Sequence, residues 1–221
     1  MYNIALDGPS GAGKSTVARK LSEQLGILYL DTGALYRAVG LKAYLCNWED
    51  DDAAVSKYLE DTEITVKYDK AANKQLVFLD EKDVSTDIRQ HFVSDYGSKF
   101  SALPSVRAKL LGTQREIAAT YDSVLDGRDI GTCVLPNAKY KFFLTASSQE
   151  RARRRFEELK AKGNCEFTVE QIQQDIEARD YRDSNREIAP LKKADDAIEI
   201  DSTKISAVEV VEFIISCIKE K

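Results

Sequence analysis

The sequence predicts an α/β fold built around a mainly parallel sheet. Apolar strand patterns alternate with helical patterns along most of the chain, and the first strand pattern runs directly into a glycine-rich turn. The chain has 221 residues, of which 43% are hydrophobic and 31% charged, so it can bury a substantial core and has the composition of a folded protein. The stretch from residue 47 to residue 84 departs from the alternation and predicts a small insert.

Before the insert, two strands and two helices are predicted in alternation. Every second residue of the segment 2–6 is a large apolar one, which predicts the first strand. The helical stripe after the glycine-rich turn should end at Gly26, a favourable residue just beyond a helix C-terminus. A short apolar strand is then expected at 27–30 and a second helix at 34–45.

The insert has the pattern of a small antiparallel unit. The three acidic residues 50–52 can cap a short helix. Apolar and polar residues then alternate over 64–68, and a polar turn at 69–74 separates this strand from another at 75–79. Two strands joined by so short a connection are expected to run antiparallel.

The alternation of helices and strands resumes after the insert. Pro104 is suited to the first position of a helix that should reach Thr120. Three further strands are expected, at 123–125, 140–144 and 197–200. Three spacings predict helix starts with a reciprocal capping box, namely Ser147 with Glu150, Thr168 with Gln171, and Ser206 with Glu209.

Composition excludes several classes of protein. The formal net charge is −5, which argues against a general electrostatic grip on nucleic acid. No apolar run approaches the length of about 18 residues that a membrane helix needs. The four cysteines lie far apart, which suits a reducing compartment, and a single histidine excludes a multi-histidine metal site. We therefore expect a cytoplasmic protein with no nucleic-acid or membrane partner. We also expect a monomer.

The glycine-rich turn matches the phosphate-loop pattern, in which Gly, four residues and then Gly-Lys-[Ser/Thr] follow a strand and open a helix. Backbone N–H groups of such a loop and the positive end of the helix bind phosphate oxygens. Lys14 is expected to reach the β- and γ-phosphates, and the Ser15 hydroxyl to ligate Mg²⁺. The expected ATP-binding residues of this segment are Gly8, Pro9, Ser10, Gly11, Ala12, Gly13, Lys14, Ser15 and Thr16.

Three classes of phosphate-loop protein compete: a small-molecule kinase, a GTPase-type switch and an ATPase motor or binding module. The guanine-reading N-K-x-D motif is absent, because the one Asn-Lys pair, Asn73-Lys74, continues with Gln-Leu. Ten of the thirteen arginines lie between Arg107 and Arg186, although the chain is acidic overall. A kinase needs arginines to hold an anionic acceptor and to neutralise the transferring group. For any one of them the simpler alternative is a solvated helix face, paired with Glu157, Glu158, Glu177 and Asp180.

Four motifs resemble bacterial-type cytidylate kinase in their order and spacing. They are Asp7-Gly-Pro-Ser-Gly-Ala-Gly-Lys-Ser15, Asp31-Thr-Gly-Ala-Leu-Tyr-Arg37, Asp126-Gly-Arg-Asp-Ile-Gly-Thr132 and Arg179-Asp-Tyr-Arg-Asp-Ser-Asn-Arg186. The first is shared by many phosphate-loop enzymes, whereas the second and third together are specific. The resemblance implies transfer of the γ-phosphate of ATP to CMP or dCMP, giving CDP or dCDP.

The resemblance also implies an adenylate-kinase-like architecture. The phosphate-loop core would comprise residues 1–31, 103–150 and 170–221. The monophosphate-binding region would span 32–102, including the antiparallel insert at about 60–85, and a short lid would span 151–169.

Site residues follow from the resemblance, position by position. The α-phosphate of CMP would be held by Arg37, Arg128 and Arg186. The cytosine edge would be read by Ser98, Arg107 and Asp129. The sugar would be reached by Arg179 and Asp183. Thr32 supplies a hydroxyl where relatives commonly have serine. The lid arginines near the ATP phosphates would be Arg151, Arg154 and Arg155. Mg²⁺ would be bound through Ser15 and Asp126. Catalysis is assigned to Lys14, Arg128, Asp126 and Arg154.

The inventory of donors and acceptors suits cytosine. A carboxylate such as Asp129 can accept from the N4 amino group, and a guanidinium such as Arg107 can donate to N3 and O2. Uracil reverses the first pairing, so the site should disfavour UMP. Two alternatives stay open: a kinase for another small acceptor, such as UMP or a shikimate-like molecule, and a nucleotide-dependent binding module with slow turnover.

Overall fold

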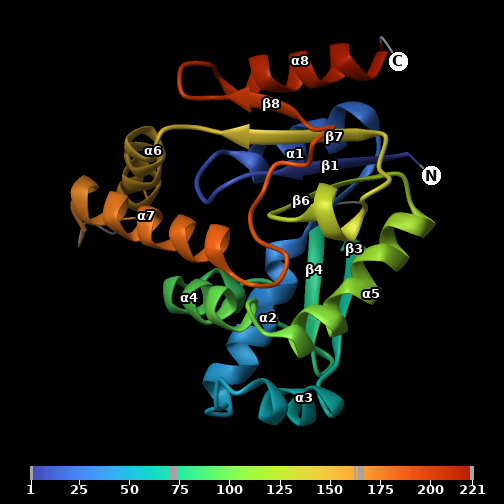
Figure 1. Ribbon diagram of the computed structural model, residues 1–221, viewed down its shortest axis with the longest axis vertical. Helices are drawn as coiled ribbons and strands as arrows, with labels where there is room; N and C mark the ends of the chain where they lie inside the picture. The colour runs from blue at the N-terminus through green and yellow to red at the C-terminus, as the bar shows by residue number, and fades with distance from the viewer. Residues whose placement is uncertain (1, 70–73, 162, 164–166, 220–221) are drawn as a thin grey trace.

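A five-stranded parallel sheet forms the centre of the molecule in the computed structural model, which describes residues 2–69, 74–161, 163 and 167–219 (Figure 1). The strand order is β2-β6-β1-β7-β8, and every neighbouring pair runs parallel. The strands are β1 (Asn3–Asp7), β2 (Leu28–Asp31), β6 (Ser123–Gly127), β7 (Tyr140–Thr145) and β8 (Ile198–Asp201). The predicted α/β class is confirmed, and all five core strands lie within two residues of their expected positions.

Helices cover both faces of this sheet because successive residues of β1 point to opposite sides. Ile4 and Leu6 pack with α1 (Lys14–Leu25) and α8 (Ala207–Lys219) in one buried cluster. Ala5 packs on the other face, with Ala118 of α5 (Pro104–Thr120). Helix α1 ends before Gly26, and α5 has Pro104 at its first turn, as predicted.

The insert is a separate antiparallel sheet, as predicted. It consists of β3 (Ile64–Asp69), β4 (Lys74–Leu79) and β5 (Lys82–Asp83), in the order β3-β4-β5. The helix before it, α3 (Asp52–Glu60), is capped by Asp51, whose carboxylate accepts from the Ala54 N–H at 3.0 Å.

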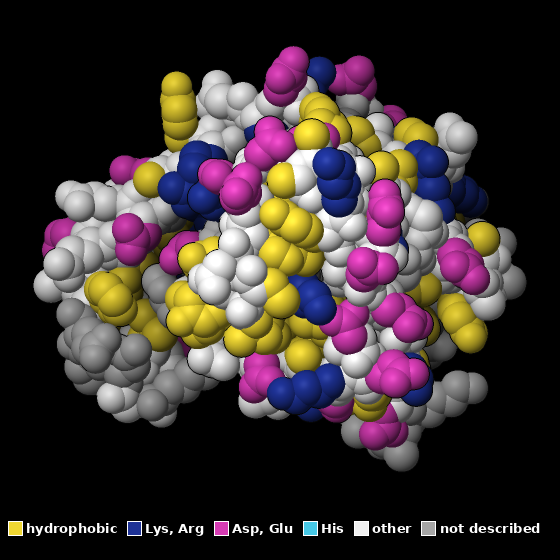
Figure 2. All heavy atoms as spheres, turned by 90° about the horizontal axis from the view of Figure 1, so that it is seen from below, with side chains coloured by type: hydrophobic (Ala, Val, Ile, Leu, Met, Phe, Trp, Pro, Cys, Tyr) yellow, Lys and Arg dark blue, Asp and Glu magenta, His cyan; other side chains and the backbone are white. Residues whose placement is uncertain are grey.

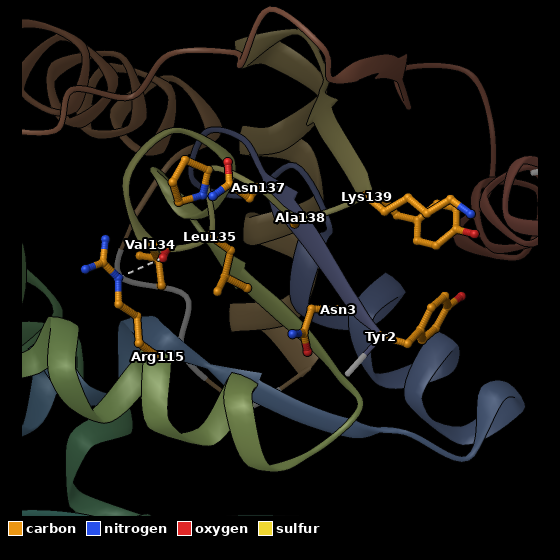
Figure 3. Close-up of a pocket in the computed structure, with 10 residues that line it drawn as sticks. Tyr2, Asn3, Arg115, Val134, Leu135, Asn137, Ala138 and Lys139 are labelled. Carbon is orange, nitrogen blue, oxygen red and sulfur yellow. Dashed lines mark hydrogen bonds between the residues drawn. The ribbon is translucent and has the colours of Figure 1, made fainter.

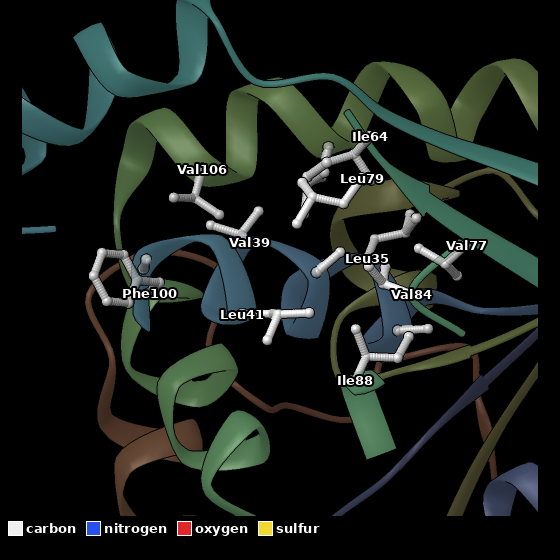
Figure 4. Packing of buried hydrophobic residues seen from close by; sticks show 14 of the residues in the cluster. Leu35, Val39, Leu41, Ile64, Val77, Leu79, Val84, Ile88, Phe100 and Val106 are labelled. Atoms are coloured by element: carbon white, nitrogen blue, oxygen red, sulfur yellow. The ribbon is translucent and has the colours of Figure 1, made fainter. Parts of the chain in front are cut away.

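The insert shares one hydrophobic core with the neighbouring helices (Figure 4). Val77 and Leu79 of β4 pack with Leu35 and Val39 of α2 (Thr32–Leu45), and Phe100 closes the cluster from α4 (His91–Phe100). Helix α4, the short turn Asp87–Arg89 and the π-type turn Ile130–Val134 were not predicted.

Helices α2 and α4 meet at glycines. A Cβ atom built on Gly40 would lie 2.4 Å from the Gly97 nitrogen, and one built on Gly97 would lie 3.1 Å from the Arg37 Cα. The two backbones therefore touch where α2 carries Arg37. This contact fixes how the helix that bears a predicted phosphate ligand packs on its neighbour.

Helices α6 (Ser148–Ala161) and α7 (Val169–Asn185) form a hairpin with a hydrophobic cluster of its own. Ala152, Ile172 and Ile176 are its buried members. The cluster extends across residue 169, the predicted end of the lid.

Two of the three predicted capping boxes form completely, at Thr168 and at Ser206. At Ser147 only the hydroxyl arm forms, because the Glu150 carboxylate binds Arg153 and Arg154 instead. The reciprocal box predicted there was wrong, since two guanidiniums are stronger partners for a carboxylate than one backbone N–H.

The end of the molecule beyond α2 and α3 mixes charges of both signs with apolar side chains (Figure 2). The exposed aliphatic and aromatic residues there are Tyr44, Leu45 and Tyr58. Within the described ranges, no helix is both long and apolar enough to span a bilayer. Cys46, Cys133 and Cys217 are free thiols, and Cys165 lies outside the described residues.

Substitution of Gly40 tests the contact between α2 and α4. Gly40→Ala should lower the free energy of unfolding by about 1–3 kcal/mol, because the added methyl group meets backbone atoms that cannot move aside. Gly112→Ala is the matched control, since a Cβ at this exposed position of α5 meets no atom within 4 Å. That change should raise stability by up to about 1 kcal/mol. Urea denaturation of both variants measures the difference, and equal effects would contradict the close contact.

Candidate active site

The predicted site residues gather at the carboxyl edge of the parallel sheet, where open α/β sheets bind ligands. Asp7 ends β1 and leads into the phosphate loop, Asp31 ends β2, and Gly127 ends β6. All core strands run parallel, so their carboxyl ends meet at one edge. The chain thus brings the loop and the arginine-bearing segments together.

The phosphate loop packs tightly against the sheet. Gly8 has a φ of +147°, and a Cβ there would lie 1.9 Å from the Leu144 carbonyl oxygen of β7. Gly13 precedes α1 without a side-chain cap, and the first turn of α1 has no acidic residue. No side chain caps the first N–H groups of α1, which leaves this helix end open to an anion, and Ser15 and Thr16 are exposed there.

Lys14 is buried inside this loop, and its Nζ donates to the Pro9 carbonyl at 2.7 Å. Burial holds the pKa of Lys14 well below its ordinary value, and the nearby Arg128 guanidinium lowers it further. The charges of Asp126 and Asp7 act in the opposite direction. Lys14 is therefore a cation whose surroundings do not supply enough negative charge.

Two carboxyl groups beside Lys14 have pKa values above the ordinary value for aspartate. Burial raises the pKa of Asp126 to about 7, and the charge of Asp31 adds to the rise. Burial also raises the pKa of Asp7 to about 6, although its carboxylate accepts hydrogen bonds from the Ile130 and Gly131 N–H groups at 2.8 and 2.7 Å. Asp7 thereby fixes the turn at the end of the Asp126–Thr132 motif.

On the acceptor side, four of the five predicted arginines pair with a buried carboxylate. Arg37 lies 2.7 Å from Asp31, and Arg128 lies 3.0 Å from Asp183. Asp129 pairs with both Arg107 and Arg186, and the Arg186 distance is 3.5 Å. The Thr32 hydroxyl donates to the Asp126 carbonyl at 2.7 Å, which joins the start of α2 to the end of β6.

Arg179 and Arg37 each keep a buried Nε without a hydrogen-bond partner. Burial lowers the pKa of Arg179 to about 10, and Arg128 and Arg37 contribute by repulsion. Unsatisfied buried donors are rare and costly in folded proteins. Two of them inside a cluster of like charges define a place that accepts an anion.

The arginines of α6 differ in where they lie. Arg151 donates to the Ser10 carbonyl of the loop at 2.9 Å and pairs with Asp180 of α7 at 2.6 Å. Arg154 donates to the hydroxyl and carbonyl oxygens of Ser202, beside the loop. Arg155 instead pairs with Glu158 on the same helix, on its solvent-facing side.

Ser98 is half-buried on α4, and its carbonyl accepts from the Ser101 hydroxyl at 2.7 Å. A pocket of about 600 Å³ lies elsewhere, at the amino ends of β1 and β7 (Figure 3). Tyr2, Lys139 and Arg115 line it, and none of the predicted site residues does. The pocket belongs to the edge of the sheet opposite the phosphate loop.

The family model that describes cytidylate kinase matches residues 4–220. This chain belongs to the cytidylate kinase family. A cytidylate kinase of Lactobacillus johnsonii is 46% identical over 100% of this chain and 95% of its own length. One from Caldicellulosiruptor bescii is 49% identical over 95% of this chain and 92% of its own length, and one from Halalkalibacterium halodurans is 48% identical over 99% and 98%.

A solved structure supports the fold alone. The crystal structure of an uncharacterized protein from Eubacterium ventriosum superposes with a TM-score of 0.55 at 14% identity and covers 100% of both chains. The resemblance to cytidylate kinase inferred from the motifs is confirmed by the family match, and the chain is an ATP-dependent phosphotransferase like the rest of that family.

The donor set of this cytidylate kinase fits Mg²⁺ that arrives with a nucleotide. Ser15 and Asp126 offer hard oxygen ligands next to the loop, of the kind Mg²⁺ prefers. The described part of the chain holds no group of three or more His, Cys, Asp or Glu residues that could enclose a metal ion. Mg²⁺ usually keeps waters and is bound by one or two carboxylates together with substrate phosphates, so two protein ligands suffice.

Sequence reasoning assigned no role to Asp7 or Asp31, and it named Asp180 only as an acidic partner of the arginines on solvated helix faces. All three stand inside the quoted motifs, and each contacts a predicted site residue or the loop that follows one. Asp7 and Asp31 each end a core strand, and this position was a signal that could have identified them. The pairing of Asp180 with Arg151 depends on the packing of α6 against α7 and left no trace in spacing.

Replacement of Lys14 tests the phosphate loop. Lys14→Ala should abolish phosphoryl transfer, because the cation that would neutralise the transferring phosphates is lost. The fold should persist, since the change also removes a buried charge that its surroundings disfavour. Turnover with ATP and CMP, together with a thermal melt, measures both effects. Near wild-type turnover in a folded variant would remove Lys14 from the mechanism.

Asp126 should show a trade-off between stability and activity. Its pKa is raised in the folded state, so ionised Asp126 lowers stability increasingly as pH rises from about 4 to about 7. Asp126→Asn should therefore stabilise the ligand-free protein by at least about 1 kcal/mol at pH 8, but hardly at pH 4. Its kcat should fall. Denaturation at the two pH values checks the prediction, and an equal change at both would contradict it.

Proposed function

We propose that this member of the cytidylate kinase family transfers the γ-phosphate of ATP to CMP or dCMP, giving ADP and CDP or dCDP. The observation that carries the proposal is the cluster of buried cations at the end of the sheet. Lys14, Arg128 and Arg179 repel one another there, and Arg37 and Arg179 keep buried donors without partners. Such a cluster is complementary to two phosphate-bearing substrates and to the charge that spreads during transfer.

The transfer relies on positioning and on electrostatic stabilisation. We assign Lys14 and the loop to the ATP phosphates, with Arg154 approaching them from α6. Arg37, Arg128 and Arg186 would hold the α-phosphate of CMP, which places it in line with the γ-phosphate. Mg²⁺, bound through Ser15 and Asp126, supplies neutralisation of the phosphate charge. No protein group has to act as a strong general base in such a step.

The base and sugar have separate ligands in the proposal. The Asp129 carboxylate accepts a hydrogen bond from the N4 amino group of cytosine. Arg107 donates to N3 and O2, and Ser98 lies beside them in the proposal. The ion pair between Arg107 and Asp129 orients both groups before the base arrives. Arg179 and Asp183 take the sugar, and Asp183 also holds Arg128.

We further propose the three-part division predicted from the sequence, with a phosphate-loop core, a monophosphate-binding region at 32–102 and a short lid at 151–169. Arg151, which donates to the Ser10 carbonyl, then joins the lid to the loop beside the ATP phosphates that we assign to it and to Arg155. A cytoplasmic monomer that consumes ATP and CMP or dCMP completes the proposal. An assay of ATP consumption against CMP, dCMP, UMP, AMP and shikimate tests it, and activity with UMP or shikimate in place of CMP would overturn it.

Asp129 provides the test of base recognition. Asp129→Ala leaves the N4 amino group unpaired, which costs about 1–3 kcal/mol, or roughly 5- to 150-fold in kcat/KM for CMP. UMP should lose little, because the lost carboxylate would have repelled the O4 of uracil. The expected result is a shift of the CMP-to-UMP ratio, measured as kcat/KM for both nucleotides.

Arg128→Ala is the matched control for this experiment. Its guanidinium would grip a phosphate that CMP and UMP share, so both substrates should weaken by about the same factor. If Asp129→Ala also lowers CMP and UMP equally, Asp129 does not read the base.

A further inference from the structure

Strand β2 is the last strand of the parallel sheet in the described structure, so one of its sides has no neighbouring strand. The Leu28 N–H donates to the Asp122 carbonyl, toward β6. In a strand of a parallel sheet, the N–H and C=O groups of one residue point to the same side, and those of the next residue point to the opposite side. The N–H and C=O of Asp31, three residues on, therefore point to the open edge.

Gln75 of β4 covers these two backbone groups. Its Oε1 accepts from the Asp31 N–H at 2.7 Å, and its Nε2 donates to the Asp31 carbonyl at 3.3 Å. A primary amide has the same donor and acceptor as a peptide group. The side chain of one insert residue thus takes the place of a missing strand at a single position.

The backbone of Asp31 at this position affects Arg37, the proposed ligand of the CMP phosphate. The Asp31 carboxylate caps α2 by accepting from the Ala34 N–H at 3.0 Å, and it holds the Arg37 guanidinium at 2.7 Å. Arg89, from the turn after the insert, lies 3.4 Å from the same carboxylate. Asp31 is buried, with 7% of its surface exposed, so a shift of its backbone would carry Arg37 with it.

We propose that Gln75 is a positioning residue that couples the insert to the binding of the CMP phosphate, by fixing Asp31 and, through its carboxylate, Arg37. The inference rests on the proposed function, because Arg37 is there the ligand of the acceptor phosphate. Gln75 itself touches neither substrate. It acts on the acceptor, since the residue it holds begins the helix that carries Arg37, whereas the ATP phosphates are assigned to α1 and the loop before it.

Kinetics of Gln75→Ala test this coupling. The KM for CMP should rise about fivefold or more, as expected when a clamp loses one or two hydrogen bonds of support. The KM for ATP should stay within about twofold of the wild-type value, and kcat at saturating CMP should change less than the KM for CMP. Lys82→Ala, at an exposed position on β5 of the same sheet, is the control and should leave all three constants unchanged.

A double-mutant cycle with Arg37 shows whether Gln75 acts through it. In an Arg37→Lys background, Gln75→Ala should cost less than about twofold in kcat/KM for CMP, because the interaction it supports is already lost. Gln75→Met keeps the volume without the amide. It should reproduce the effect of Gln75→Ala, and it keeps the test decisive if the alanine variant does not fold.

Each alternative outcome separates the two proposals. An equal rise in the KM for ATP, or effects of Gln75→Ala and Arg37→Lys that multiply independently, would overturn the role of Gln75. A wild-type protein that does not phosphorylate CMP would instead overturn the proposed function, whatever the variants do.

Discussion

The architecture of the site depends on one constraint, which is that several positively charged side chains are buried close together, away from water. Guanidiniums and an ammonium converge at one edge of the sheet, and burial lowers the pKa of both Lys14 and Arg179. Removing unpaired cations from water is costly, so the fold must supply compensating groups. It does so with buried carboxylates placed at strand ends and on α7, each bonded to one or two arginines. The compensation is incomplete, and in the proposed function the remaining positive charge binds phosphate.

The carboxylates differ in how strongly their surroundings favour the charged form. Burial raises the pKa of Asp129 and of Asp126, whereas Arg128 and Arg179 outweigh burial at Asp183 and hold its pKa below the ordinary value. Asp31 is likewise held low, because Arg37 and Arg89 outweigh its burial. Asp31 and Asp183 thus stay ionised, whereas burial outweighs the arginines at Asp129. Asp126, beside the loop, has a pKa of about 7 and becomes charged readily when a cation approaches.

Much of the fold could be predicted because local sequence patterns determine it. The core strands, the phosphate loop and the helix from Pro104 have periodicities or motifs confined to a few residues. Helix α4 escaped prediction, since its segment contains Gly97 and aromatic residues and begins without a side-chain cap. Strand β5 has two residues, too few for any period.

The candidate site was likewise predictable only where its signal lies within a short segment of the sequence. Residues inside motifs were found, but contacts that join distant segments were not. Gln75 lies 44 residues from Asp31, and the two meet only because the insert packs beside the edge of the sheet. The commitment of Arg151 to Ser10 and Asp180 likewise follows from tertiary packing, which spacing along the chain does not encode.

The hairpin of α6 and α7 is held internally by an apolar cluster and by the Arg151–Asp180 ion pair, and charged and hydrogen-bonding groups join it to the rest of the chain. Its buried members are Ala152, Ile172 and Ile176, whereas Arg154 meets Ser202 and Asp183 meets Arg128 at its borders. Dissolved salt screens ion pairs and leaves apolar packing intact or strengthened. Added salt therefore weakens the charged contacts of the hairpin and leaves its apolar cluster intact, with the smallest effect on the largely buried Arg128–Asp183 and Arg151–Asp180 pairs.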